Sequence, residues 1–405
     1  MMDVIIVGGG AAGFFTAINL KEQRPDLKVL ILEKSKNVLS KVKISGGGRC
    51  NVTHACFIPK DLVKNYPRGR KELLGPFHRF MTGDTMEWFE SRGVPLKIEG
   101  DGRIFPESNK SESIINCFLE LTKKLEIQVE LSVNVQEFKQ VEGGSWMLYA
   151  KDKTYTSKAL VLVPGASKPL WEQLASHGHN IVAPIPSLFT FNIKDSRLEG
   201  IPGVSVEKGR CKIAGAKGGT KGPILVTHWG LSGPAILKLS AESARELHDK
   251  NYQFTLLVNW LNMDLDEVED LVEDFRENNR KMKLIQRSLD SRIPKRLWER
   301  LIEFSQIDSK KRWADLSNKD IKILIQTLFA CEFKVDGKST FKDEFVTAGG
   351  VSLKEINFKT YESKLFPNLF MAGEFIDVDA VTGGFNFQNA WTGGFIIAEA
   401  LGSRL

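Results

Sequence analysis

A glycine turn near the N-terminus constrains the fold more than any other feature of the sequence. The apolar run Val4–Val7 stops at GGGAAG, which occupies positions 8–13 and has the spacing G-x-G-x-x-G. Ala11–Lys21 then predicts a helix, and Lys28–Leu32 predicts a second buried strand. A strand, glycine turn, helix and strand within about 30 residues are typical of the first βαβ unit of a doubly wound sheet. The turn therefore predicts an α/β fold.

The motif also predicts that the chain binds a dinucleotide. Gly8 permits the tight turn, Gly10 lets a pyrophosphate approach the backbone, and Gly13 lets helix and strand pack closely. Ala11 and Ala12 begin the helix, whose N-terminus offers unpaired N–H groups and a partial positive charge to phosphates. The alternative is a glycine-rich turn that holds no ligand.

Glu33 supplies the acid that accompanies this motif. It ends the second strand, 20 residues after Gly13, and Lys34 follows it. A carboxylate at this place accepts hydrogen bonds from ribose hydroxyls and repels a 2′-phosphate. Because strand, helix and acid are in register, dinucleotide binding is favoured over an empty turn.

Two later segments favour FAD over NAD. The glycine- and lysine-rich stretch Lys41–Asn51 breaks the alternation of strands and helices where a flavin ring would extend. Near the C-terminus, Leu369–Ala372 predicts a buried strand that ends at Gly373 and Glu374, and a last helix begins near Asn386. We expect the start of that helix to face the flavin pyrimidine edge, where its dipole stabilises the negative charge of a reduced ring.

The stretch KISGGGRCN at 43–51 resembles the S-G-G-G-R-C-N signature of the aminoacetone oxidase-like FAD flavoproteins, a bacterial family. Four other stretches resemble segments of that family: GRIFP at 102–106, THWGLSGP at 227–234, GEFID at 373–377 and TGGFNFQ at 382–388. The match spans nearly the whole chain. One departure is clear, because the family continues as A-T-G-G where this chain has Pro164, Gly165 and Ala166. Among the predicted FAD-binding residues, those that would contact the adenine are therefore the least defined.

The resemblance implies three parts, which agree with shifts in composition along the chain. A discontinuous, Rossmann-like FAD-binding domain is expected at 1–186 and 342–405. A β-barrel-like domain is expected as an insertion at 187–262 and 331–341, and a small helical subdomain at 263–330. Within the last part, leucines and phenylalanines recur at helical spacing and Pro294 interrupts them.

Motif and resemblance together predict a set of FAD-binding residues. These are Gly8, Gly10, Ala11, Ala12, Gly13, Glu33, Lys34, Lys43, Ser45, Gly46, Gly47, Gly48, Arg49, Cys50, Asn51, Val135, Pro164, Gly165, Ala166, Gly373, Glu374, Asp377, Gly384, Phe385, Asn386, Phe387 and Gln388.

Arg49, Asn51 and His228 are the candidates for catalysis. Arg49 carries a fixed charge beside the expected flavin, where it would orient a carbonyl or carboxylate substrate or stabilise the reduced ring. A phosphate contact or a structural contact is the alternative for Arg49. His228 would act as an acid or base near neutral pH, and a hydrogen-bonded turn histidine is the alternative. No histidine spacing suggests a metal site.

The five cysteines predict no disulfide framework, because their number is odd and their spacing irregular. Cys50 and Cys56 lie near the place where disulfide reductases carry C-x-x-x-x-C, but five residues separate them here. A second G-x-G-x-x-G for NAD(P)H is also missing from the sequence. We therefore expect buried, redox-inert thiols.

The net charge and the hydropathy of the sequence narrow the classes of partner that we expect. The net charge of +6, from 56 basic and 50 acidic residues, is spread along the 405 residues, so we expect no nucleic acid partner. No apolar run approaches the roughly 18 residues that span a bilayer. The N-terminus has no signal-peptide pattern, so a cytoplasmic location without membrane attachment is expected.

The sequence thus predicts an FAD-dependent oxidoreductase with a small-molecule substrate. In one version a small amine or aminoketone reduces FAD, and O₂ reoxidises it. In the alternative, NAD(P)H reduces FAD and the enzyme then reduces an unsaturated or carbonyl substrate. The lack of a second nucleotide motif favours the first version. An alternative of another class is a flavin-dependent RNA-modifying enzyme, or a protein that binds FAD for structure.

Overall fold

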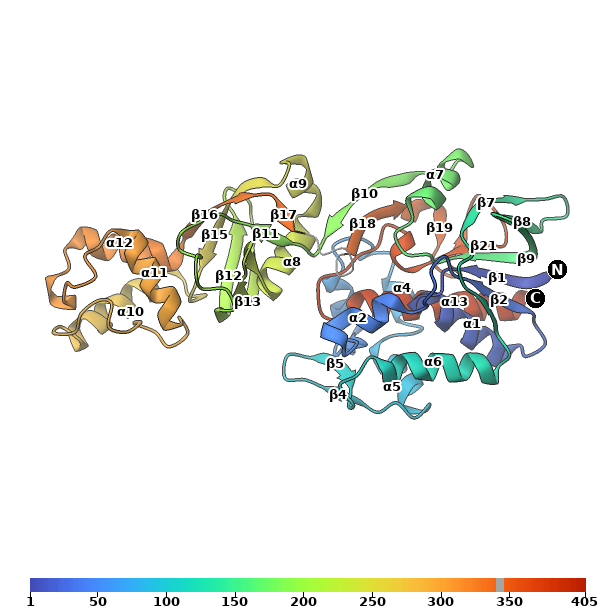
Figure 1. The fold of residues 1–405 in the computed structure, drawn as a ribbon, viewed down its shortest axis with the longest axis horizontal. Helices are drawn as coiled ribbons and strands as arrows, with labels where there is room; N and C mark the ends of the chain where they lie inside the picture. The colour runs from blue at the N-terminus through green and yellow to red at the C-terminus, as the bar shows by residue number, and fades with distance from the viewer. Residues whose placement is uncertain (340–345) are drawn as a thin grey trace. The chain divides into compact units, whose positions relative to one another are not determined.

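The computed structural model describes residues 1–339 and 346–405. The chain divides into two compact units, Met1–Ile185 with Lys342–Leu405, and Pro186–Phe341. Each unit has its own sheets and helices, drawn in Figure 1. Because the N-terminal and C-terminal segments belong to the same unit, the first unit is discontinuous in the sequence.

A parallel sheet forms the centre of the first unit. Five strands lie in the order β21-β9-β1-β2-β6, with bounds β1 (Met2–Val7), β2 (Val29–Leu32), β6 (Gln128–Glu130), β9 (Lys153–Leu162) and β21 (Leu369–Met371). Val4 pairs with Val29 on one side and Ala159 on the other. The strands are rich in valine, leucine and isoleucine because both faces of such a sheet are covered. Two short antiparallel strands, β19 (Ile356–Asn357) and β20 (Glu362–Ser363), extend its edge.

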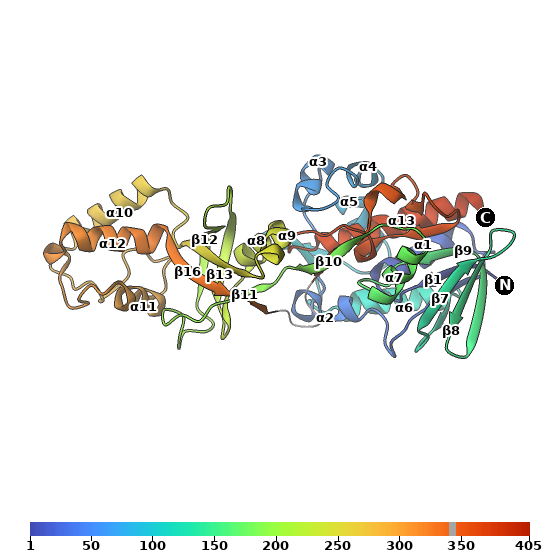
Figure 2. The same ribbon diagram turned by 90° about the horizontal axis from the view of Figure 1, so that it is seen from above.

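Helices α1 (Ala11–Gln23) and α13 (Phe385–Arg404) pack side by side in this unit, as Figures 1 and 2 show. A Cβ atom on Gly394 would lie 3.0 Å from the Ala12 carbonyl oxygen, so glycine allows the two helix backbones to approach closely. The apolar core beside α6 (Glu112–Lys124) is aromatic. Trp391 of α13 is fully buried there, with ring centroids 5.3 Å from Phe15 and 5.6 Å from Phe118.

Smaller elements complete the first unit. They are α2 (Ser40–Gly48), β3 (Thr53–His54), α3 (Pro59–Leu62), α4 (Leu74–Phe77), α5 (Thr82–Glu90), β4 (Leu96–Ile98), β5 (Arg103–Pro106), β7 (Val135–Gln140), β8 (Trp146–Ala150), α7 (Lys168–Ser176), β10 (Ile181–Ser187), β18 (Val346–Val351) and the short helices η1 (Val63–Asn65), η3 (Leu353–Glu355) and η4 (Gly373–Phe375). The stretch Lys41–Asn51, expected to break the alternation of strands and helices, overlaps α2, whose backbone leaves helical geometry at Ser45, Gly46 and Gly47.

The second unit contains a seven-stranded sheet in the order β16-β15-β12-β13-β14-β11-β17. Its strands are β11 (Thr190–Asn192), β12 (Ser205–Ile213), β13 (Thr220–Val226), β14 (Gly230–Ser232), β15 (Gln253–Asn259), β16 (Cys331–Asp336) and β17 (Lys338–Ser339). The first and last strands are separated in the chain by Gly337 alone, so the sheet curls into a barrel-like form. Helix α8 (Pro234–Glu242) packs on it, followed by α9 (Ala244–Asp249).

Helices α10 (Leu265–Asn278), α11 (Lys295–Ser305) and α12 (Asn318–Phe329), with η2 (Trp313–Asp315), complete the second unit. Pro294 stands directly before α11, which explains the break in periodicity. Their buried side chains, such as Trp298 and Leu324, belong to the same apolar core as Val258 and Phe333 of the sheet. The separate helical subdomain at 263–330 stays a prediction. In the two described ranges, no helix has both the length and the apolar character that crossing a membrane requires.

We expect Trp391→Ala to lower the free energy of unfolding by about 3–5 kcal/mol, the usual cost of removing a fully buried tryptophan. The variant also leaves the Val52 carbonyl oxygen without the indole N–H that lies 3.0 Å away. Urea denaturation followed by circular dichroism measures the change. Trp229→Ala is the matched control, since Trp229 is 57% exposed and its loss should matter little. Equal effects of the two substitutions would contradict the prediction.

Candidate functional site

The carboxyl ends of the parallel strands bring distant segments of the first unit to one edge of the sheet. Gly8 follows β1, Glu33 follows β2, Pro164 comes shortly after β9, and Gly373 comes shortly after β21. Since ligands of such sheets bind in the crevice outside the carboxyl ends, this edge is the candidate site. All four of these residues were predicted from the sequence.

In the glycine turn there is open space beside Gly10, whereas the backbone packs closely against Gly8 and Gly13. Gly8 has φ +120°, and a Cβ there would lie 2.4 Å from the Val163 carbonyl oxygen. A Cβ on Gly13 would lie 2.0 Å from the Gly8 oxygen, whereas one on Gly10 meets nothing within 4 Å. No side chain caps the N-terminus of α1, and its first turn carries no acid. Open space beside uncapped N–H groups fits the pyrophosphate of a dinucleotide.

Glu33 is held by the turn that it faces. Its Oε2 accepts a hydrogen bond from the Gly9 N–H at 2.8 Å, and its Oε1 accepts from the backbone N–H and hydroxyl of Ser35 at 2.9 and 2.7 Å. A carboxylate has about four acceptor positions. One position therefore remains for a ribose hydroxyl, and that role stays a prediction.

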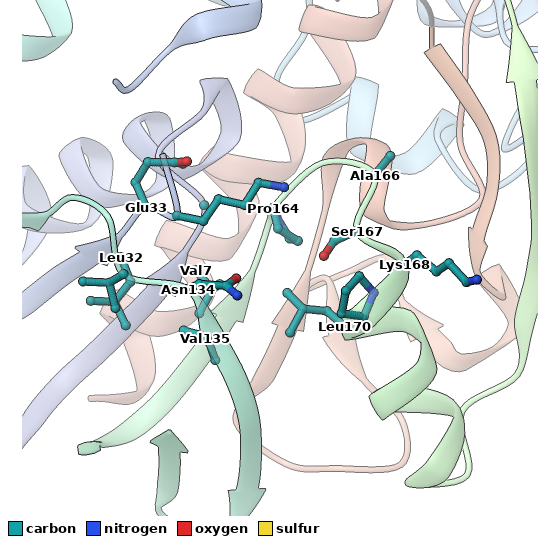
Figure 3. A pocket seen from close by; sticks show the side chains of 14 residues that line it. Val7, Leu32, Glu33, Asn134, Val135, Pro164, Ala166, Ser167, Lys168 and Leu170 are labelled. Atoms are coloured by element: carbon teal, nitrogen blue, oxygen red, sulfur yellow. The ribbon is translucent and has the colours of Figure 1, made fainter. Parts of the chain in front are cut away.

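A cavity of about 150 Å³ adjoins Glu33, and Figure 3 shows its side chains. Six predicted residues line it: Gly8, Glu33, Lys34, Val135, Pro164 and Ala166. Eight further lining residues were missed: Val7, Leu32, Val133, Asn134, Ser167, Lys168, Pro169 and Leu170. The signal that could have found the last four was their place after the carboxyl end of β9. Valine and leucine walls beside a carboxylate suit the flat face and the ribose of an adenosine.

The stretch 43–51, predicted to lie beside the flavin, has backbone at its glycines that no side chain covers. Gly47 and Gly48 have positive φ and open space around their Cβ positions, whereas a Cβ on Gly46 would lie 2.9 Å from the Phe105 ring. The Ser45 hydroxyl donates to the Val42 carbonyl oxygen at 3.0 Å, and Lys43 is exposed. A loop of this kind lets a planar ring approach the chain closely.

Arg49 has two partners on the hairpin formed by β4 and β5. Its guanidinium lies 3.8 Å from the centre of the Phe105 ring and donates to the Glu99 carboxylate at 2.6 Å. Its charge is therefore compensated by Glu99, which the sequence reading did not single out. These contacts match the structural alternative for Arg49, and its catalytic role stays a prediction.

Hydrogen bonds hold the start of α13 in place. Some come from residues predicted to belong to the site, and others from residues that the sequence did not indicate. In the orientation that suits its neighbours, the Asn51 amide accepts from the Gly384 N–H at 3.0 Å and donates to the Thr53 oxygen at 3.0 Å. The Tyr66 hydroxyl donates to the Phe385 oxygen at 2.6 Å. Asn386 accepts from the Ala380 N–H at 3.0 Å. The N-terminus of α13 thus has a defined direction, as a helix dipole aimed at a ligand requires.

Two other residues of α13 that were predicted to bind FAD have side chains that contact other protein side chains. Gln388 is fully buried and accepts hydrogen bonds from the Thr53 and Thr85 hydroxyls at 2.6 and 3.0 Å. The Phe387 ring stacks on Trp391, with centroids 5.6 Å apart. Both side chains serve the packing of α13.

The loop before α13 carries two charged contacts. Glu374 pairs with Lys41 at 2.5 Å and accepts from the Thr347 N–H at 2.9 Å. Asp379 is fully buried and binds the Arg68 guanidinium through both carboxylate oxygens. Asp377 lies in the same loop. The Arg68–Asp379 pair was missed, since nothing in the local sequence joins the two residues.

His54 was missed as well. Its Nδ1 lies 3.2 Å from the Gly383 carbonyl oxygen, and its ring is tilted over Phe385 with centroids 4.6 Å apart. It therefore supports the glycine pair that precedes α13.

The cysteines are all free thiols. Cys50 is fully buried, and burial raises the pKa of its thiol to about 12. Cys56 is half-buried, and burial raises the pKa of its thiol too. Neutral thiols are poor nucleophiles, in line with redox-inert cysteines.

His228 belongs to the second unit, in the loop between β13 and β14. It is exposed and lines a cavity of about 700 Å³ together with Lys194 and Trp229. It is the only predicted catalytic residue in that unit.

Comparison with known proteins defines the class: this chain is an FAD-dependent oxidoreductase with a Rossmann-like FAD domain, which confirms the predicted cofactor and fold. A family model described as HI0933-like protein Rossmann domain matches residues 2–400, and the chain belongs to that family.

Two curated relatives extend over its full length. One is 3-dehydro-bile acid delta(4,6)-reductase of Clostridium scindens, 26% identical over 100% of both chains. Another is ribosomal RNA dihydrouridine synthase of Escherichia coli, 28% identical over 98% of both. A solved structure with this fold is 3-ketosteroid-delta4-(5alpha)-dehydrogenase of Rhodococcus jostii, with TM-score 0.55, 13% identity and coverage of 99% of this chain and 96% of that one.

The open space at Gly10 predicts a variant that separates folding from cofactor binding. We expect Gly10→Ala to keep the unfolding midpoint of the apoprotein and to weaken FAD binding about tenfold, or roughly 1.4 kcal/mol. Gly13→Ala should instead destabilise the apoprotein by about 1–3 kcal/mol, because its Cβ has no room. Thermal unfolding and FAD titration by flavin fluorescence measure both. Equal stability losses for the two variants would sink this interpretation.

The raised pKa of Cys50 predicts an unreactive thiol. Since the thiolate forms only as the pH nears about 12, iodoacetamide at pH 8 should leave Cys50 unmodified in the native protein. Unfolding in urea should make it react, as peptide mass spectrometry would show. Cys50→Ser should keep wild-type turnover. A loss of turnover with FAD still bound would instead assign Cys50 a chemical role.

Proposed function

We propose that this enzyme reduces a carbon–carbon double bond conjugated to a carbonyl group, with electrons from NAD(P)H. The observation that carries the proposal is that the two relatives described above are named for this kind of change. One is a delta(4,6)-reductase, and the other forms dihydrouridine, which is uridine with one ring double bond saturated. Both match essentially the whole chain, inserted unit included.

Bound FAD would supply the hydride-transfer chemistry that links the reduced nicotinamide to the β-carbon of the conjugated bond. The chain itself must hold the substrate carbonyl and place a proton on the α-carbon. Arg49 is paired with Glu99, so its charge is already compensated. In the described part of the chain, the His228 side chain makes no hydrogen bond or ion pair. The catalytic role that the sequence predicts for His228 stays a prediction.

We propose the uracil ring of RNA as the substrate class. Curated relatives from Escherichia coli and Haemophilus influenzae, 28% and 26% identical over 98% of this chain, are both named ribosomal RNA dihydrouridine synthase. The proposal departs from our expectation of no nucleic acid partner, which rested on the small net charge and its spread along the chain. A small steroid-like enone is the competing substrate, in view of the Clostridium scindens relative. Oxidation of an amine by O₂ stays a prediction, which the experiment below tests directly.

An anaerobic experiment separates these functions. We expect NADPH or NADH to bleach the visible flavin band of the FAD-loaded protein. Addition of unmodified ribosomal RNA, transcribed in vitro, should then restore the band and form dihydrouridine, detected by mass spectrometry of nucleosides. Restoration by a 3-oxo-Δ4 steroid but not by RNA would assign a small enone as substrate. Bleaching by aminoacetone, with none by either nicotinamide, would overturn the proposal in favour of amine oxidation.

A further inference from the structure

A hairpin of the second unit concentrates positive charge. Between positions 208 and 221 the chain carries five basic residues and no acid: Lys208, Arg210, Lys212, Lys217 and Lys221. Strands β12 and β13 form this hairpin and lie side by side in Figure 1. Glu207 precedes this stretch on β12, so the hairpin has a net charge of +4, against +6 for the whole chain.

The strand geometry turns several of these side chains outward. Cys211 and Ile213 are buried in the core, so the alternating residues Arg210 and Lys212 face away from it. Lys221 lies directly opposite Arg210 in the register of the two strands. Like charges in that position destabilise a sheet, so packing gives no reason for them.

Four lysines of the hairpin have no compensating partner. Arg210 is bonded to Asn262 and Asp264. For Lys208, Lys212, Lys217 and Lys221, in contrast, no hydrogen bond or ion pair to any described residue occurs, and all four are exposed. Lys208, Lys212 and Lys221 lie on the two strands, and Lys217 lies in the turn between them. Free ammonium groups gathered in this way suit the phosphates of a polyanion.

Many acidic residues of the same unit lie on helix α10, which carries seven acids and one base, Arg276. The residue at the start of this helix, Asp264, pairs with Arg210 of the hairpin. The positive charge that no ion pair offsets therefore lies on the four lysines. In a sum over the chain, the acids of α10 hide this basic surface.

Trp229 adds an aromatic platform at the far end of β13. Its ring is 57% exposed, although its backbone is held by a bond from the Ile193 N–H to the Trp229 oxygen at 2.8 Å. Gly230 next to it has no room for a side chain, since a Cβ would lie 2.3 Å from the Phe191 oxygen. An exposed indole on a fixed backbone is a surface on which unpaired bases stack.

The spacing suits a single strand of nucleic acid. Eight positions separate Lys221 from Trp229, at most about 26 Å at roughly 3.3 Å per residue. The cavity beside Trp229 is lined by Lys194 and His228 and also by three acids, Asp195, Glu199 and Asp336, of which Asp195 is paired with Arg197. The phosphate contacts of this surface therefore come from the lysines of the hairpin, and Trp229, in the loop after β13, offers base stacking.

We propose that Lys208, Lys212, Lys217, Lys221 and Trp229, here called the lysine–tryptophan surface, are where RNA docks on this enzyme. The lysines contact phosphates, and Trp229 stacks on an unpaired base. The inference rests on the proposed function, since it assumes that the substrate uracil is part of an RNA.

The test measures binding apart from chemistry. The FAD-loaded full chain is titrated with fluorescently labelled, unmodified ribosomal RNA fragments at several salt concentrations. A fourfold variant carries Lys208→Gln, Lys212→Gln, Lys217→Gln and Lys221→Gln. A matched control replaces four exposed lysines of the first unit by glutamine: Lys71, Lys123, Lys124 and Lys151. Circular dichroism and the flavin absorbance confirm that each variant is folded.

We expect the fourfold variant to lower the slope of log K against log salt by about 3, at ~0.7 per lost phosphate contact with a single strand. Its Kd should rise more than tenfold at physiological salt, while the control keeps wild-type binding. Trp229→Ala should raise the Kd about tenfold with the slope unchanged, because stacking carries no counterion release.

Wild-type affinity and slope in the fourfold variant would overturn the docking surface. If the wild type still converts uridine in that case, the proposed function survives and only the surface is wrong. If wild-type protein neither binds RNA nor is reoxidised by it, both the RNA substrate and the docking surface fall. A loss of binding as large in the control as in the fourfold variant would reduce the effect to net charge, and would also overturn the surface.

Discussion

Close contact between backbones is the constraint on which the first unit depends. Gly13 packs against the Gly8 carbonyl with no room for a Cβ, and Gly394 brings α13 against the Ala12 carbonyl of α1. These contacts bind the first and last segments of the chain into one unit. The same contacts set the direction of both helix N-termini that a dinucleotide would meet. The same glycines therefore allow the close packing and set the geometry of the predicted cofactor site.

Many residues around the start of α13 serve to hold this helix in place. Asn51, Tyr66 and Gln388 use their hydrogen bonds on the protein, and Arg68 holds the buried carboxylate of Asp379. Removing one partner of such a buried pair leaves an uncompensated charge, which is strongly destabilising. These residues hold the start of the helix in place. A preorganised site of this kind spends no energy on rearrangement when charge develops.

Charge placement gives the second unit its character. The acidic α10 and the basic β12–β13 hairpin nearly cancel in any sum over the chain, but they lie on different elements. An extended ligand responds to local potential within a Debye length of about 8–10 Å, so the sum is a poor guide to its binding. An RNA substrate is compatible with a modest net charge when the lysines are gathered on one hairpin.

Sequence by itself determined the βαβ unit, the glycine turn with Glu33 and the return of the C-terminal strand and helix to the same domain. The βαβ unit and the glycine turn depend on short-range rules of periodicity, glycine spacing and strand ends. The shared domain of the first and last segments was what the resemblance to a flavoprotein family implied. Only the tertiary structure decided that Glu99 compensates Arg49, that Gln388 faces threonines, and that residues 167–170 line the cavity beside Glu33. Arg49 and Gln388 contact partners far away in the chain, so the pattern around either residue carries no signal of those partners. Residues 167–170 did carry a signal, their place after the carboxyl end of β9, but only folding brings them to the cavity beside Glu33.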